Sequence, residues 1–227
     1  MAPKTIQESD LYRRLRGAKH GVILVLGTGQ WGKTVTVHSL IASGVFGDRN
    51  IALVNYPTDF VESHAYPKNY RSVSWPEDLS KISDIIHPSR DVVVIDDAIF
   101  IAGARDFSTR ENRGLQKMMT ISSHHELFFI LTIQNTSMLD ISMFQSQDVY
   151  MIHKHMDIIA LQNERDQQVV SQTIANCVLT KYMRSHKKAI HPKAWGYCST
   201  TKEIISFEIP PWWHPAMSKP FYGVIPG

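Results

Sequence analysis

A glycine-rich segment, residues 27–34, has the residue types and spacing of a site that binds phosphate groups. It reads Gly-Thr-Gly-Gln-Trp-Gly-Lys-Thr and fits the pattern G-x-x-x-x-G-K-[ST]. In this pattern backbone N–H groups converge on phosphate oxygens, the lysine reaches the outer phosphates and the final hydroxyl binds Mg²⁺. The segment therefore predicts a phosphate loop for ATP, with Thr34 also a ligand of Mg²⁺; its residues are Gly27, Thr28, Gly29, Gln30, Trp31, Gly32, Lys33 and Thr34.

The same glycines also fit G-x-G-x-x-G, the pattern of a dinucleotide-binding loop. A dinucleotide site requires an acidic residue about 20 positions later, at the end of the second strand, to hold a ribose. Asn55 ends that predicted strand here, and Asp59 comes late. A dinucleotide site would also leave Lys33 and Thr34 without a role. We therefore favour the phosphate loop over a dinucleotide site and over a chance match.

Two carboxylates, Asp96 and Asp97, directly follow the apolar run Val92 to Ile95. Ligands of parallel sheets bind outside the carboxyl ends of the strands, which is where these side chains would lie. We expect Asp96 to complete the Mg²⁺ shell and Asp97 to orient or deprotonate the attacking water. The alternative is that one of the two carboxylates only caps the following turn.

A polar residue, Gln134, ends the apolar run 127–133. An amide at the end of a strand, beside two nucleotide-binding elements, can sense the γ-phosphate or position water. The alternative is turn chemistry, because the Asn-Thr-Ser sequence that follows is a plausible loop start. We favour Gln134 as the sensor.

Three arginines, Arg105, Arg110 and Arg113, follow the acidic pair. The S-x-x-E pattern at 108–111 predicts the start of a helix, on which Arg110 and Arg113 lie three positions apart and share a face. One of the three could serve as an arginine finger for the nucleotide of a neighbouring subunit. A solvated helix face is the alternative.

Short apolar runs alternate with helical segments along the chain, and these elements must position the polar groups. We predict helices over 3–16, 33–43, 76–86, 108–124 and 161–179, and strands over 20–26, 50–55, 91–95, 127–133 and 148–153. Residues 56–75 are loop-like, with a short strand at 71–74. The alternation predicts an α/β fold with a parallel sheet covered on both faces. Residues 195–199 and 203–209 predict a hairpin, and we expect the tail 210–227 to be extended and packed on a neighbouring surface.

The composition of the 227 residues, 43% apolar and 20% charged, is that of a globular protein. No apolar run approaches the roughly 20 residues of a membrane span, and the N-terminal residues lack the apolar stretch of a secretory signal. Both ends of the chain are basic and the middle is acidic, which suits a polyanion partner or simple solubility. We expect a basic arm (1–17), an ATPase domain (18–180) and a basic, aromatic extension (181–227) packed on the same domain.

The order of these motifs resembles that of the FtsK/HerA-type additional-strand ATPases. A phosphate loop is followed by an apolar strand ending in two aspartates, a helix with Arg and Asn, and a buried strand ending in Gln. The closer likeness is to the A32-like genome-packaging ATPases of double-jelly-roll viruses, including tectivirus-like phages, and it covers about residues 18–180. Members of that family often have Arg-His where this chain has His124-His125, so the finger is not assigned by position.

The resemblance implies a P-loop NTPase fold of the RecA/FtsK/HerA type, with a mostly parallel sheet in the order 5-1-4-3-2. It also implies ATP and Mg²⁺ as ligands and a homo-oligomeric ring, a hexamer or pentamer. Such a ring would drive double-stranded DNA into a procapsid at a capsid vertex or portal, in the host cytoplasm or the virion. Two alternatives stay open. One is a small-molecule P-loop kinase; the other is a nucleotide-gated assembly or scaffold protein, similar to the zonula-occludens-toxin-like proteins of filamentous phages.

Overall fold

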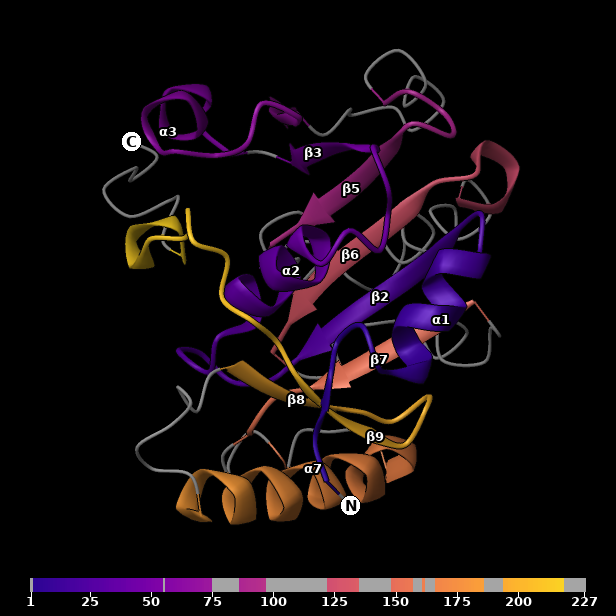
Figure 1. Ribbon diagram of the computed structural model, residues 1–227, viewed down its shortest axis with the longest axis vertical. Coiled ribbons are helices and arrows are strands. Elements are labelled where there is room, and N and C mark those ends of the chain that lie inside the picture. The colour runs from indigo at the N-terminus through magenta and orange to yellow at the C-terminus, as the bar shows by residue number, and fades with distance from the viewer. Residues whose placement is uncertain are drawn as a thin grey trace.

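The computed structural model describes residues 2–54, 56–74, 86–96, 122–134, 148–156, 161, 166–185 and 194–218. The helices are α1 (Asp10–Gly17), α2 (Lys33–Ala42), α3 (Thr58–Ser63), α7 (Asp166–Ser185) and the 3₁₀ turn η6 (Pro215–Ser218). The strands are β1 (Lys4–Thr5), β2 (Gly21–Leu26), β3 (Asn50–Val54), β4 (Tyr70–Val73), β5 (Asp91–Ile95), β6 (Phe128–Ile133), β7 (Val149–His153), β8 (Trp195–Cys198) and β9 (Glu203–Ser206). In Figure 1, α1 and α2 lie in front of the sheet, and α7 lies beside the β8–β9 hairpin.

The described strands form one sheet in the order β1-β9-β8-β7-β2-β6-β5-β3-β4. Its middle, β7-β2-β6-β5-β3, is entirely parallel and follows the order 5-1-4-3-2 of the five predicted strands. The whole sheet differs in detail from the prediction, because β4 extends it at one edge and β8, β9 and β1 extend it at the other. The predicted hairpin is confirmed as β8 and β9, which add antiparallel strands to the parallel sheet.

Strand β2 lies at the centre of the sheet and is buried on both faces. Ile23 and Val25 belong to one hydrophobic cluster, which also holds residues of α1 and α2. Val22, Leu24 and Leu26 alternate with them along the strand and belong to a second cluster. A strand between two apolar layers has to be apolar at every position, which explains the continuous run in the sequence. The carboxyl end of this anchored strand is where the phosphate loop begins.

Three predictions of helical structure need correction. The first helix begins at Asp10 rather than at residue 3, because the Ser9 hydroxyl caps it by accepting a hydrogen bond from the Tyr12 backbone N–H at 3.1 Å. The residues before it form β1, which is too short to leave a periodic pattern in the sequence. Helix α3 occupies part of the segment predicted as a loop, and α7 extends to Ser185 rather than ending at Leu179.

Other predictions fall outside the described residues. These are most of the helix over 76–86, residues 108–121 of the helix predicted over 108–124, and the tail from 219 onward. Within the described part of the tail, Trp212 packs against the first hydrophobic cluster. No helix in the described part of the chain is both long and apolar enough to cross a lipid bilayer.

Candidate nucleotide-binding site

The glycine-rich segment 27–34 connects β2 to α2 and has the backbone of a tight loop. Gly27 and Gly32 have φ angles of 150° and 78°, and Gln30 between them has a φ of 66°. A Cβ atom on Gly27 would lie 2.7 Å from the Cβ of Lys154, so only glycine fits this close approach. Gly32 precedes the first turn of α2, and no side chain caps that helix. The N–H groups of the first turn are therefore available for an anion.

The two polar side chains at the end of the loop point in different directions. The ammonium group of Lys33 donates a hydrogen bond to the backbone oxygen of Thr28 at 3.2 Å, so Lys33 is folded back over its own loop. The hydroxyl of Thr34 donates to Oδ2 of Asp96 at 2.8 Å. This contact joins the phosphate loop to the predicted acidic element, which lies 62 residues away in the sequence.

The Asp96 carboxylate directly follows β5 and accepts hydrogen bonds from three hydroxyl groups. Oδ2 accepts from Thr34 and, at 2.9 Å, from Tyr56, while Oδ1 accepts from Thr132 at 2.5 Å. Burial, and then the Asp96 charge, raise the pKa of Tyr56 well above its ordinary value, so Tyr56 stays protonated and remains a donor.

The oxygens around Asp96 fit a magnesium ion. A carboxylate and a hydroxyl 2.8 Å apart, beside a loop shaped for phosphate, are hard ligands of the kind that Mg²⁺ prefers. Asp96 and Thr34 are the two residues that would hold the cation, as the sequence predicts. In the described part of the chain, no group of three or more His, Cys, Asp or Glu residues is placed to bind another metal.

Of the other predicted site residues, only Gln134 lies in the described part of the chain. It directly follows β6, and the register pairs Ile95 of β5 with Leu131 of β6, so Gln134 lies at the same edge of the sheet as Asp96. Asp97, Arg105, Arg110 and Arg113 lie outside the described residues. Their roles remain predictions, as does that of Gln134.

A second wall of the loop, which the sequence did not indicate, comes from residues 154–156 after β7. The Lys154 N–H donates to the Leu26 oxygen at 2.7 Å, and the Thr28 hydroxyl donates to the His155 oxygen at 3.5 Å. The rings of Trp31 and His155 lie 4.4 Å apart between centroids, with an angle of 32° between their planes. The Trp31 indole of the phosphate loop therefore packs on this segment.

Helix α7 fixes that segment from behind through buried polar contacts. His153 lies between the Gln172 amide oxygen and the Ser199 hydroxyl, each 2.8 Å from one of its ring nitrogens. The Gln172 amide also donates to the Lys154 oxygen, and the Asn176 amide donates to the Met156 oxygen, both at 2.8 Å. Burial lowers the pKa of His153 to about 4, although its bond to Gln172 acts in the opposite direction.

Lys154 is an unexpected buried cation in this region. Its ammonium group donates to the backbone oxygen of Trp195 and lies 5.8 Å from the centre of the Phe207 ring. Burial lowers the pKa of Lys154 to about 7. Its side chain thus runs toward the β8–β9 hairpin, away from the phosphate loop that its backbone supports.

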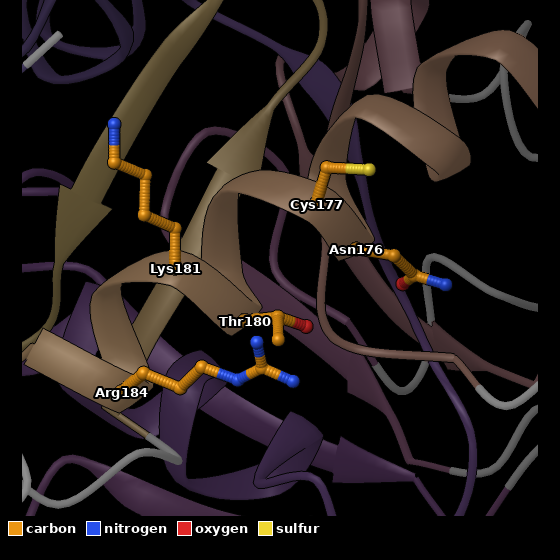
Figure 2. Close-up of a pocket in the computed structure, with 5 residues that line it drawn as sticks. All are labelled: Asn176, Cys177, Thr180, Lys181 and Arg184. Atoms are coloured by element: carbon orange, nitrogen blue, oxygen red, sulfur yellow. The ribbon is translucent and has the colours of Figure 1, made fainter.

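A broad hollow of about 620 Å³ runs along α7, and none of the predicted site residues is among its described lining residues. Figure 2 shows its lining, in which Thr180 and Arg184 are one helical turn apart; the lining residues are Asn176, Cys177, Thr180, Lys181 and Arg184. The phosphate loop and the Asp96 carboxylate, not this hollow, hold the groups that could act on a nucleotide.

The fold is similar to that of solved viral packaging enzymes. One is the DNA-packaging ATPase B204 from Sulfolobus turreted icosahedral virus, with a TM-score of 0.52, 12% identity, and coverage of 85% of this chain and 98% of that one. Another is the genome packaging NTPase B204 from Sulfolobus turreted icosahedral virus 2 in complex with ATP-gammaS, with a TM-score of 0.52, 13% identity, and coverage of 85% and 99%. No protein-family model matches the sequence, and no curated protein matches it. The likeness establishes the fold as that of an α/β P-loop NTPase, the fold class that the sequence predicts.

Proposed function

We propose that this protein is an ATP hydrolase that moves double-stranded DNA, and that it packages a viral genome. The observation that carries the proposal is the 2.8 Å hydrogen bond between Thr34 and Asp96. It brings a phosphate loop and a carboxylate together at the carboxyl edge of a parallel sheet, which is where such sheets bind ligands. This contact supports the proposal that two motifs far apart in the sequence form one site for a nucleotide and its cation.

The residues divide the chemistry among them. The loop N–H groups and the first turn of α2 would bind phosphate oxygens, and Lys33 would leave the Thr28 oxygen to pair with the outer phosphates. Thr34 and Asp96 would hold Mg²⁺, which neutralises phosphate charge when it is bound. Asp97 would orient or deprotonate the attacking water, and Gln134 would sense the γ-phosphate. One of Arg105, Arg110 and Arg113 would reach the nucleotide of the neighbouring subunit.

The proposal of DNA movement has separate support. The solved structures similar to this chain include a DNA-packaging ATPase and a genome packaging NTPase, as their names state. Both ends of the sequence are basic, which suits a polyanion such as DNA. A finger that acts in trans requires a ring of subunits, and the partners of that ring would lie at a capsid vertex or portal.

The test is the rate of ATP hydrolysis with and without duplex DNA, measured over a range of protein concentrations. We expect duplex DNA to raise the rate, and the specific activity to rise with protein concentration as subunits assemble. A Lys33→Ala variant is the control for contaminating ATPases. Turnover that requires a small-molecule acceptor would indicate a kinase instead. Nucleotide binding without DNA-stimulated turnover would indicate a scaffold.

A further inference from the structure

Two of the three hydroxyl groups on the Asp96 carboxylate belong to residues outside the motifs of the site. Thr34 is the last residue of the phosphate loop, but Tyr56 lies in the segment after β3 and Thr132 lies within β6. In the sheet, β3 and β6 are the two neighbours of β5, the strand that Asp96 follows. The carboxylate is therefore held from both flanking strands, with one flanking hydroxyl on each oxygen.

Tyr56 is a fixed donor because its ring cannot move freely. Its side chain is 3% exposed and belongs to the first hydrophobic cluster, together with Tyr70 and Val61. Its backbone oxygen accepts a hydrogen bond from the hydroxyl of Ser72, which lies in β4. A buried tyrosine hydroxyl requires a partner, and the Asp96 carboxylate supplies one at 2.9 Å.

Thr132 is equally fixed on the opposite side of the carboxylate. Its side chain is fully buried, and the parallel pairing of β5 with β6 places Thr132 next to Asp96. Its hydroxyl lies 2.5 Å from Oδ1, whereas Tyr56 and Thr34 both donate to Oδ2. Two donors on different oxygens fix the rotation of the carboxylate group about its own axis.

We propose that Tyr56 and Thr132 are positioning residues that orient the Asp96 carboxylate for the divalent cation and so set the affinity for Mg²⁺. This inference rests on the proposed nucleotide site. Outer hydrogen-bond partners hold a ligating carboxylate in the direction that the cation requires. Thr34 would itself bind the cation. The hydrogen bonds from Tyr56 and Thr132 are therefore the ones that would hold the Asp96 carboxylate in its orientation when Thr34 turns to the cation.

The test is the binding of a non-hydrolysable ATP analogue at a series of Mg²⁺ concentrations, including EDTA, followed by calorimetry. We expect Tyr56→Phe and Thr132→Val each to weaken the Mg²⁺-dependent part of the affinity by about 10-fold, the lower end of the usual effect of such partners. Binding in EDTA should stay at the wild-type level. Thr132→Ser keeps a hydroxyl and should restore the Mg²⁺ dependence.

Tyr70→Phe is the matched control, because Tyr70 lies in the same hydrophobic cluster but its hydroxyl contacts His38, 3.3 Å away, instead of Asp96. It should leave the Mg²⁺ dependence unchanged. The inference is overturned if Tyr56→Phe and Thr132→Val bind the magnesium complex like the wild type, or if their affinity in EDTA falls equally. If Tyr56→Phe fails to fold, as judged by thermal unfolding, the Thr132→Val and Thr132→Ser pair decides. A wild-type protein that binds no nucleotide would instead contradict the proposed function itself.

Discussion

On its β5 side the phosphate loop faces a carboxylate held by three hydroxyl groups, whereas on its β7 side it packs against backbone atoms and an aromatic ring. The first contact is made of oxygens that a cation can use. The second consists of the Lys154 and His155 backbone and the ring of His155, fixed from behind by Gln172 and Asn176. On the β5 side the loop therefore meets groups that could bind a cation, and on the β7 side it meets groups that only hold it in place. Substitutions on the two sides should have different consequences.

The largest expected effect is that of Lys33→Ala, which changes the loop itself. The variant should lose ATP hydrolysis completely, because it removes the cation that would pair with the outer phosphates. Its melting temperature should stay near that of the wild type, since Lys33 is only half-buried and its ammonium group donates to the Thr28 oxygen of its own loop. A folded Lys33→Ala variant with normal turnover would falsify the assignment of the phosphate loop.

An arginine finger supplied in trans would reach the nucleotide from a neighbouring subunit. Arg110→Ala or Arg113→Ala should each be inactive alone if that residue is the finger, by about 1,000-fold or more. Mixing the inactive variant with Lys33→Ala should recover activity, because a mixed interface can pair an intact loop with an intact arginine. The measurement is the ATPase rate as a function of mixing ratio. Full activity of all three single variants, Arg105→Ala included, would exclude a finger among them.

Substitutions of Asp96 and Asp97 can separate cation binding from catalysis of water attack. Asp97→Asn should keep Mg²⁺-ATP binding but lose turnover, by about 100-fold or more, because it removes the base and leaves the cation site intact. Asp96→Asn should weaken the Mg²⁺-dependent binding itself. Titration of both variants with Mg²⁺ and a non-hydrolysable analogue measures the difference. The reverse pattern would mean that the two roles are exchanged.

Substitutions on the β7 side should lower the free energy of unfolding and leave the turnover number almost unchanged. Gln172→Leu removes the buried hydrogen bonds from Gln172 to the Lys154 oxygen and to a His153 ring nitrogen, so it should lower the free energy of unfolding by about 1–3 kcal/mol. Chemical denaturation measures this loss, and the turnover number below the melting temperature should change little. Thr173→Ala, at the exposed neighbouring position, is the control and should be nearly neutral. A large fall in turnover without a loss of stability would contradict the comparison.

Low pH should destabilise the folded protein, because it favours protonation of the buried His153. Burial lowers the pKa of His153 in the folded protein from 6.5 to about 4, so the unfolded chain binds a proton more readily. The contribution of neutral His153 to the free energy of unfolding is therefore fully present above pH 6.5 and is lost progressively as the pH falls toward 4. A His153→Gln variant should lose about 1–2 kcal/mol less than the wild type between pH 7 and pH 5. Urea denaturation at the two pH values measures the difference, and equal losses in both proteins would exclude this role.

The loop and the strands next to it could be predicted because each is marked by a contiguous run of residues in the sequence. The eight loop residues are contiguous, and the apolar runs of β2 and β5 lead directly into the polar groups that they position. The order of the middle strands followed from the resemblance, not from the runs themselves. Tyr56 could not be predicted in the same way, because it lies in an apparent loop and its meeting with Asp96 depends on the pairing of β3 with β5.

The second wall was missed for a related reason. His153 and His155 form a close pair in the sequence, but the hydrogen bonds of His153 come from α7, which begins more than ten residues later, and from the β8–β9 turn. Thr132 is one polar residue within an apolar strand, and only the register between β5 and β6 shows that it lies beside a carboxylate. Contacts of this kind are set by packing between distant segments, which single residue patterns do not reveal.

Strands β1 and β9 pair although they lie far apart in the sequence, and this affects the order in which the strands of the sheet can pair. Lys4 and Glu203, 199 residues apart in sequence, form an ion pair at 2.5 Å across these strands. Closing such a long loop costs entropy, and contacts of this range slow folding. On the ribosome, β1 would emerge before β9 and remain without this neighbouring strand until β9 had left the exit tunnel. The strands around the glycine-rich loop can pair before then, so a nascent chain would form this part of the sheet before it closes the edge at β1.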